Sequence, residues 1–169
     1  MESKERRVAS IKDRYLTFEL DDELYGVEIL SVKEIIGFQK TVHVPRMPDY
    51  VKGVMNLRGQ IIPVIDLRSK LKMETIEPTD ENAIIILIID KVYIGFVVDR
   101  VKDVTAISKD EISESPSFGS KIDTNFIKHM ANLKEGVVMI LNIESIFETD
   151  ELNALGDIAQ EDKTLKETK

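Results

Sequence analysis

The stretch NLRGQIIPVIDL at residues 56–67 is matched without gaps by NLKEGVVMILNI at residues 132–143, 76 positions later. A second pair follows in the same order: YGVEILSVKEI at residues 25–35 matches IGFVVDRVKDV at residues 94–104, 69 positions later. Two apolar strands can resemble each other by chance, but two matches in the same order favour duplication of one ancestral unit. The sequence therefore predicts two similar halves.

Each half consists of short strands separated by polar turns. YLTFEL at residues 15–20 alternates apolar and polar side chains, and an acidic turn joins it to the strand at residues 24–29, as in a hairpin. Further hairpin turns are expected at Arg58-Gly59-Gln60, Asp90-Lys91 and Lys134-Glu135-Gly136. Pro63 cannot donate to a ladder, so its strand is predicted to lie at an edge or to carry a bulge. About five strands per half favour a small closed barrel, because closure hides the strand edges.

The predicted domain covers residues 14–160, with charged ends that are expected to be disordered. The expected divisions are a disordered arm at residues 1–13, a first lobe at about 15–71, a polar linker at 72–81, a second lobe at about 82–142, an amphipathic helix at about 143–160 and a disordered tail at 161–169. Residues 113–125 are expected to form a long loop.

Composition and charge limit the possible functions. The 169 residues include 22 Ile and 15 Val against 6 Ala, and β-branched side chains pack well on pleated surfaces, so the predicted fold class is all-β. The net charge of −8 argues against binding to nucleic acid or to anionic lipid. The absence of Cys excludes disulfides and thiolate sites. We expect no signal peptide and no membrane insertion, since residues 1–13 are charged and the longest apolar run is Ala83–Ile89.

The sequence contains few residues that could carry catalysis. Its two histidines, His43 and His129, lie in predicted strands, where structural roles are the more common ones. Asp66, Asp90 and Asp99 could form a carboxylate pair, but two of them flank strands as turn residues do. No metal-ligand spacing and no phosphate-binding loop is present, so no cofactor is expected. A protein that recognises other proteins is the favoured class.

The segment VKGVMNLRGQIIPVIDL at residues 51–67 resembles the signature of the CheW family of bacterial chemotaxis coupling proteins. The stretches at residues 15–18, 25–36 and 95–101 agree with the same family. The resemblance implies two five-stranded SH3-like barrels packed together. It also implies a cytoplasmic, non-enzymatic adaptor, monomeric when free, that links chemoreceptor cytoplasmic hairpin tips to the regulatory domain of the histidine kinase CheA in receptor clusters beneath the inner membrane.

The resemblance also implies two sets of contact residues. The receptor-facing set is Val32, Glu34, Ile35, Gly53, Arg58 and Gly59. The kinase-facing set is Gly95, Val97, Val98 and Asp99, of which alternation allows only one valine to face outward. Arg58 could instead be a solvated turn residue, and both glycines of the first set could matter only through backbone shape. The kinase-facing residues could instead belong to a plain core strand.

Two other functions remain open from sequence alone. A small β-barrel enzyme or ligand-binding module would use Asp66, Asp99 or His129. A fragment of a CheV or CheA protein would contain the same domain within a longer reading frame.

Overall fold

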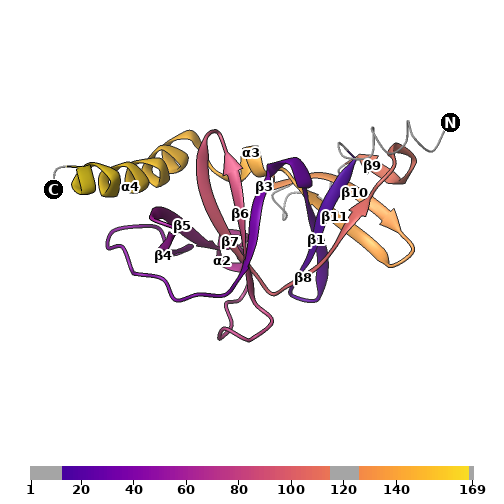
Figure 1. Ribbon diagram of the computed structural model, residues 1–169. Helices are drawn as coiled ribbons and strands as arrows, with labels where there is room; N and C mark the ends of the chain where they lie inside the picture. The colour runs from indigo at the N-terminus through magenta and orange to yellow at the C-terminus, as the bar shows by residue number, and fades with distance from the viewer. Residues whose placement is uncertain (1–12, 115–125, 168–169) are drawn as a thin grey trace.

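The computed structural model describes residues 13–114 and 126–167, which form eleven strands and three α-helices (Figure 1). The strands are β1 Arg14–Leu20, β2 Glu23–Glu28, β3 Val32–Gly37, β4 Val51–Leu57, β5 Gln60–Asp66, β6 Ala83–Ile89, β7 Val92–Val98, β8 Arg100–Ala106, β9 Ile112–Glu114, β10 Ile127–Leu133 and β11 Gly136–Leu141. The helices are α2 Leu67–Lys70, α3 Ile143–Ile146 and α4 Thr149–Glu167, and two 3-10 turns lie at Ile29–Ser31 and Lys109–Glu111. Most of the predicted arm and of the predicted 113–125 loop lies outside the described residues.

Three of the predicted hairpins close through two-residue turns with left-handed backbones. The residues with positive φ are Asp21 and Asp22 between β1 and β2, Arg58 and Gly59 between β4 and β5, and Asp90 and Lys91 between β6 and β7. Positive φ at both central positions gives the type I′ twist that matches paired strands. The sequence therefore determined these hairpins locally.

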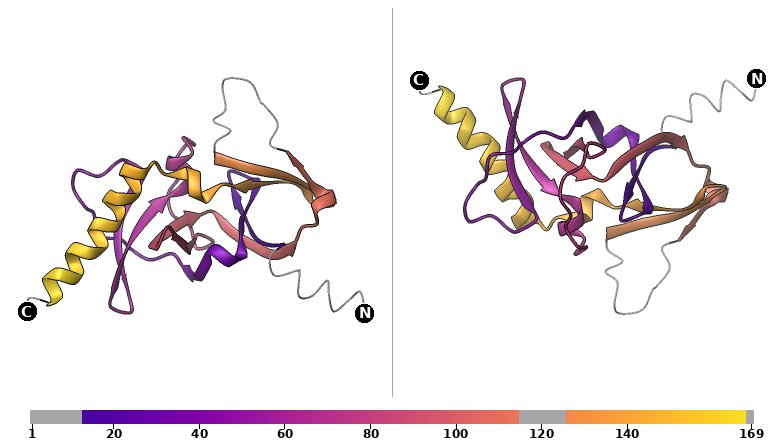
Figure 2. Two further views of the ribbon diagram at one scale, coloured as in Figure 1. Left: turned by 90° about the horizontal axis from the view of Figure 1, so that it is seen from above. Right: turned by 90° about the horizontal axis from the view of Figure 1, so that it is seen from below.

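The predicted fold class is confirmed: the chain is mostly β, with two sheets and a C-terminal helix. One sheet has the order β8-β1-β2-β11-β10-β9, and the other has the order β3-β6-β7-β5-β4. The first sheet has six strands where five were expected, because the short strand β9 pairs with β10. Figure 2 shows the two sheets from above and below, with the six-stranded one on the side of the N-terminus.

The expected division into sequential lobes at about 15–71 and 82–142 differs from the strand pairing. Strands β1 and β2 join a sheet otherwise made of β8–β11, whereas β3, β4 and β5 pair with β6 and β7. Each half therefore contributes its first hairpin to the sheet completed by the other half. Four pairs join strands of different halves: β1 with β8 and β3 with β6 are antiparallel, and β5 with β7 and β11 with β2 are parallel.

The two parallel pairs have equivalent registers, which supports the duplication. Val64 lies opposite Gly95 in one sheet, and Ile140 lies opposite Gly26 in the other. These residues are related by the same offsets of 76 and 69 that relate the sequence repeats. Added Cβ atoms would meet Ile84 at 2.8 Å from Gly95 and Ile140 at 3.0 Å from Gly26. Glycine thus allows the exchanged strands to pack closely in both halves.

Pro63 is not on an edge strand, since β5 lies between β7 and β4. Pro63 pairs with Val54 of β4, but the ladder to β7 includes only residues 64–66. Its missing N–H therefore does not interrupt the parallel pairing.

Three apolar cores hold the molecule together. One lies within each sheet: Met55, Ile62 and Ile86 belong to the five-stranded side, and Ala131, Val138 and Ile140 belong to the six-stranded side. The largest core lies between the sheets and is formed by residues of both: Leu16, Phe18, Leu20, Val27, Ile65, Ile85, Leu87, Phe96 and Val98 are among its members. Because this core is shared, the two sheets form a single folding unit.

The C-terminal helix is interrupted and longer than expected. Helix α3 ends at Ile146, and α4 runs from Thr149 to Glu167, seven residues beyond the predicted limit at residue 160. Leu155 is buried against the shared core, which docks the first turns of α4 beside β5 and β7. The remainder of α4 projects away from the sheets in Figure 1.

Candidate functional site

A charge pair joins the β4–β5 turn to edge strand β3. Arg58 donates from both terminal nitrogens to the Glu34 carboxylate, at 2.8 and 2.6 Å. The hydrogen bonds and charge of Arg58 lower the pKa of Glu34 below its ordinary value, so the carboxylate is ionised at neutral pH. The Arg58 side chain is 73% exposed while it makes this contact. It is therefore an ordered surface group rather than a freely solvated turn residue.

A β-bulge places two apolar residues of the receptor-facing set on one side of β3. Val32 lies opposite Leu87 and Ile35 lies opposite Ile85, with the register shifted between Val32 and Glu34. Without this extra residue, positions three apart would face opposite sides of the strand. Val32 packs against the shared core, whereas Ile35 is 42% exposed.

The two glycines of the same set have different structural roles. A Cβ on Gly53 would meet the backbone carbonyl of Val42, because the segment before β4 passes close to this strand. Gly59 has a positive φ of 86° in the hairpin turn, and its amide donates to Asn56 Oδ1 at 2.8 Å. Both glycines therefore shape the backbone on either side of Arg58.

The kinase-facing set lies mainly in the interior, and neither of the two valines faces outward. Val97 is 7% exposed and packs in the core of the five-stranded sheet, and Val98 is 1% exposed and packs in the shared core. Gly95 lies beneath Ile84. Alternation failed as a guide because β7 is a central strand with cores on both faces. These three residues are placed to support a surface rather than to form one.

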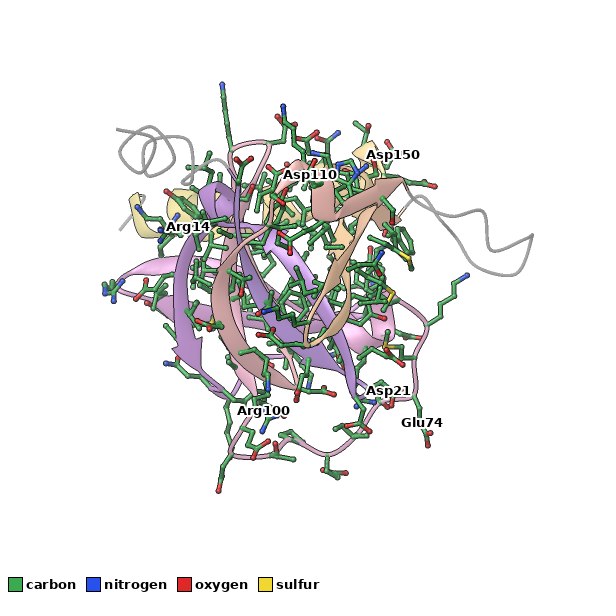
Figure 3. The ribbon with its side chains drawn as sticks, turned by 90° about the vertical axis from the view of Figure 1, so that its right-hand side faces the viewer. Arg14, Asp21, Glu74, Arg100, Asp110 and Asp150 are labelled. Carbon is green, nitrogen blue, oxygen red and sulfur yellow. The ribbon has the colours of Figure 1, made fainter. Side chains whose placement is uncertain are left out.

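Asp99 forms a clasp where the chain crosses from one sheet to the other. Its carboxylate accepts two hydrogen bonds from Arg68, at 2.8 and 2.6 Å, and one from the Asp21 amide at 2.8 Å. Arg68 also donates to the Glu74 carbonyl at 2.9 Å. Figure 3 shows Asp21 and Glu74 close together at the lower right. The clasp thus joins α2, the β1–β2 turn, the residue 72–82 segment and the β7–β8 junction.

The Asp99 clasp is charged at neutral pH. Burial by itself would raise the pKa of the Asp99 carboxyl, but the hydrogen bonds from Arg68 and Asp21 and the charge of Arg68 hold it below its ordinary value. Arg68 is only 8% exposed, so its buried charge is compensated mainly by this partner.

The residues considered for an enzyme or ligand site do not form a reactive constellation in the described part of the chain. Asp66 caps α2 by accepting from the Arg68 amide at 3.1 Å. Asp99 is held in the clasp, and His129 lies in β10 between β11 and β9. Among residues 13–114 and 126–167, no group of three His, Cys, Asp or Glu side chains is arranged to hold a metal ion.

Sequence reasoning missed the cluster that fixes α4. Lys70 lies 3.0 Å from Glu151 and 4.4 Å from the ring centre of Tyr50, and Tyr50 donates its hydroxyl hydrogen to the same carboxylate. These residues are far apart in the chain, so no local pattern could indicate the cluster. Sequence reasoning also missed Val42, which is 69% exposed although it pairs with Val54 of β4. An apolar residue beside Lys40 and His43 was the available signal.

Comparison with known proteins assigns the chain to a family. The CheW-like domain model matches residues 14–151. Chemotaxis protein CheW of Klebsiella aerogenes is 31% identical over 151 residues, which cover 89% of this chain and 91% of that protein. CheW of Treponema pallidum is 33% identical over 147 residues, covering 85% and 86% respectively.

A solved structure agrees with the sequence relatives. The crystal structure of the scaffolding protein TtCheW from Thermoanaerobacter tengcongensis matches with a TM-score of 0.75 and 31% identity, covering 83% of this chain and 95% of that one. No helix within the described ranges is long and apolar enough to cross a membrane. From the family model, the relatives and the shared fold, we conclude that this chain belongs to the CheW-like family of chemotaxis coupling and scaffold proteins.

Proposed function

We propose that this chain is a non-enzymatic cytoplasmic scaffold, monomeric when free, that couples chemoreceptor hairpin tips to the regulatory domain of the histidine kinase CheA in receptor clusters. The observation that carries the proposal is the Glu34–Arg58 pair, which braces an edge strand whose bulge puts Val32 and Ile35 on one side. An exposed apolar residue, Ile35, next in the chain to an ordered ion pair suits recognition of a helical partner and needs no reactive group.

The proposed mechanism is positional. The shared core makes the two sheets one body, so partners bound to different faces are held in a fixed geometry. A receptor state that fits Ile35 and Arg58 better than its alternative then biases the kinase equilibrium through that difference in affinity. Gly53 and Gly59 contribute by setting the backbone around Arg58.

Charge exchange tests the receptor surface. We expect Arg58→Glu and Glu34→Arg each to weaken binding of a chemoreceptor cytoplasmic fragment, measured by calorimetry, because each variant places like charges together. The Arg58→Glu/Glu34→Arg double variant restores the internal pair. Recovery of binding in it would assign the pair a bracing role, and continued loss would assign direct contact to the individual charges. Unchanged affinity in both single variants would refute the assignment.

A second titration tests the kinase partner. We expect saturable one-to-one binding to the isolated CheA regulatory domain, in the roughly micromolar range of transient signalling contacts. Since Gly95, Val97 and Val98 are interior, the contacts come from other, exposed residues. Asp99→Ala and Arg68→Ala should then affect kinase binding equally, through the clasp. Loss of binding in Asp99→Ala alone would instead make Asp99 a direct contact, and no binding by the parent protein would refute the kinase partner.

A further inference from the structure

The segment between β3 and β4 closes the gap between the two outermost strands of the five-stranded sheet. It leaves β3 at Gly37 and returns beside β4, where the Val42 amide and carbonyl both bond to Val54, at 2.8 and 2.9 Å. Thr41 Oγ1 donates to the Lys52 carbonyl at 3.2 Å, and Lys52 Nζ lies 5.4 Å from the ring centre of Phe38. In Figure 1 this segment runs in purple along the lower left. We call the surface of Lys40, Val42, Arg46 and Lys52 the basic seam.

The basic seam is positively charged in an acidic protein. Residues 33–58 contain five basic and two acidic side chains, a net charge of +3, against −8 for the whole chain. Several cations elsewhere are neutralised: Arg68, Lys70 and Lys128 each lie within 3.0 Å of a carboxylate. Within the described part of the chain, Lys40 and Arg46 have no such partner. The unneutralised charge therefore faces outward in this region.

Val42 supplies an apolar contact between these charges. Its exposed fraction of 69% is the highest among the large hydrophobic side chains described as exposed, although its backbone is fixed by two hydrogen bonds. Since both backbone groups of Val42 are already bonded to Val54, an extended peptide cannot pair with it as an added strand. Val42 therefore offers a partner its side chain, which is what an amphipathic helix recognises.

We propose that the basic seam docks an acidic amphipathic helix of the chemoreceptor, so that the receptor surface continues from the Glu34–Arg58 pair onto the Lys40–Arg46 segment. This inference rests on the proposed function. The charges match, because a helix with carboxylates beside an apolar residue would neutralise Lys40 and Arg46 while covering Val42. The seam is also continuous with the proposed receptor surface. Val42 pairs with β4, which Arg58 directly follows, and Glu34 lies on β3, which leads into the seam.

The experiment measures binding of a chemoreceptor cytoplasmic fragment to the full chain by calorimetry. The variants are Lys40→Glu/Arg46→Glu and Val42→Asp, with Lys109→Glu as the matched control. Lys109 is exposed, lacks an ion-pair partner within the described ranges, and follows Lys40 by the 69-residue offset of the repeat. Far-UV circular dichroism and thermal melting verify that each variant is folded.

We expect the double charge variant and Val42→Asp each to lose affinity by about tenfold or more, and the control to keep parent affinity. Between about 50 and about 300 mM salt, the parent should weaken more steeply than the double variant, because screening removes only charge attraction. Parent-like affinity of both seam variants would overturn this inference while leaving the proposed function intact. No binding by the parent would overturn both. Binding of the parent to phosphatidylglycerol vesicles, lost in the double variant with receptor affinity unchanged, would replace the helix by a lipid surface.

Discussion

Removing the Asp99 carboxylate tests whether the clasp holds the two sheets together. Asp99→Ala leaves the guanidinium of Arg68, which is 8% exposed, without two charge-assisted hydrogen bonds of 2.8 and 2.6 Å. Breaking a buried pair by removing one partner costs roughly 3–5 kcal/mol. The Asp99 side chain is 22% exposed, and the Asp21 carboxylate stays 3.8 Å from Arg68, so we expect the lower end of that range.

The assay is thermal unfolding followed by circular dichroism. For a chain of this size, 1 kcal/mol shifts Tm by roughly 2–4 °C, so a loss of about 3 kcal/mol lowers Tm by about 6–12 °C. Arg58→Ala is the matched control, because Arg58 makes an equally bidentate pair while 73% exposed, and it should change Tm little. In a double-mutant cycle, Arg68→Ala/Asp99→Ala should cost clearly less than the two single variants together. The reasoning would be refuted if Asp99→Ala lowered Tm no more than Arg58→Ala does. It would also be refuted if the double variant lost as much stability as the two single variants added together.

The clasp also predicts how stability depends on acidity. The folded-state pKa of Asp99 is lowered, so its contribution is complete above the unfolded-state value, about 3.9, and is lost as pH falls through the folded-state value. The free energy of unfolding of the parent, measured with urea, should therefore fall steeply below about pH 4. The Asp99→Ala variant should show a smaller loss in the same range, and an identical pH dependence would contradict the assignment.

Three further outcomes follow from the packing and the charges. Gly95→Ala should destabilise the protein by about 1–3 kcal/mol, since the added Cβ meets Ile84 at 2.8 Å. Gly37→Ala should be tolerated, because its added Cβ meets no atom within 4 Å. Equal urea midpoints for the two variants would contradict this. Glu151→Ala removes the carboxylate partner of Lys70, whose side chain is 9% exposed. We expect faster amide hydrogen exchange in the first turns of α4, measured by mass spectrometry. Unchanged exchange would show that the Leu155 contact alone holds the helix. Burial raises the pKa of Tyr25 to about 12. Stability should therefore fall between about pH 10 and pH 12, because the tyrosine ionises at lower pH in the unfolded state than in the folded state. Tyr25→Phe should abolish the part of this loss that comes from Tyr25.

Much of this protein could be predicted locally. Acidic and glycine-containing turns determined three hairpins, because a two-residue turn with positive φ requires no information from distant parts of the chain. The motif at residues 51–67 indicated the family, and the two offsets of 76 and 69 indicated a duplicated unit. The set around Arg58 was also predicted to be one site, and the structure does bring Glu34 and Arg58 into contact.

What the sequence could not decide is which sheet each hairpin joins. Beside β1, strand β2 has a second edge, and its backbone can bond equally well to a strand of its own half or to β11 of the other half. The choice therefore depends on how side chains fill the shared core. The same long-range packing buries both Val97 and Val98, because β7 became a central strand. It also placed Arg68 beside Asp99, 31 residues away. Short-range patterns thus determined the strands and turns, while burial against distant residues, which no local pattern encodes, decided which surfaces remain exposed for partners.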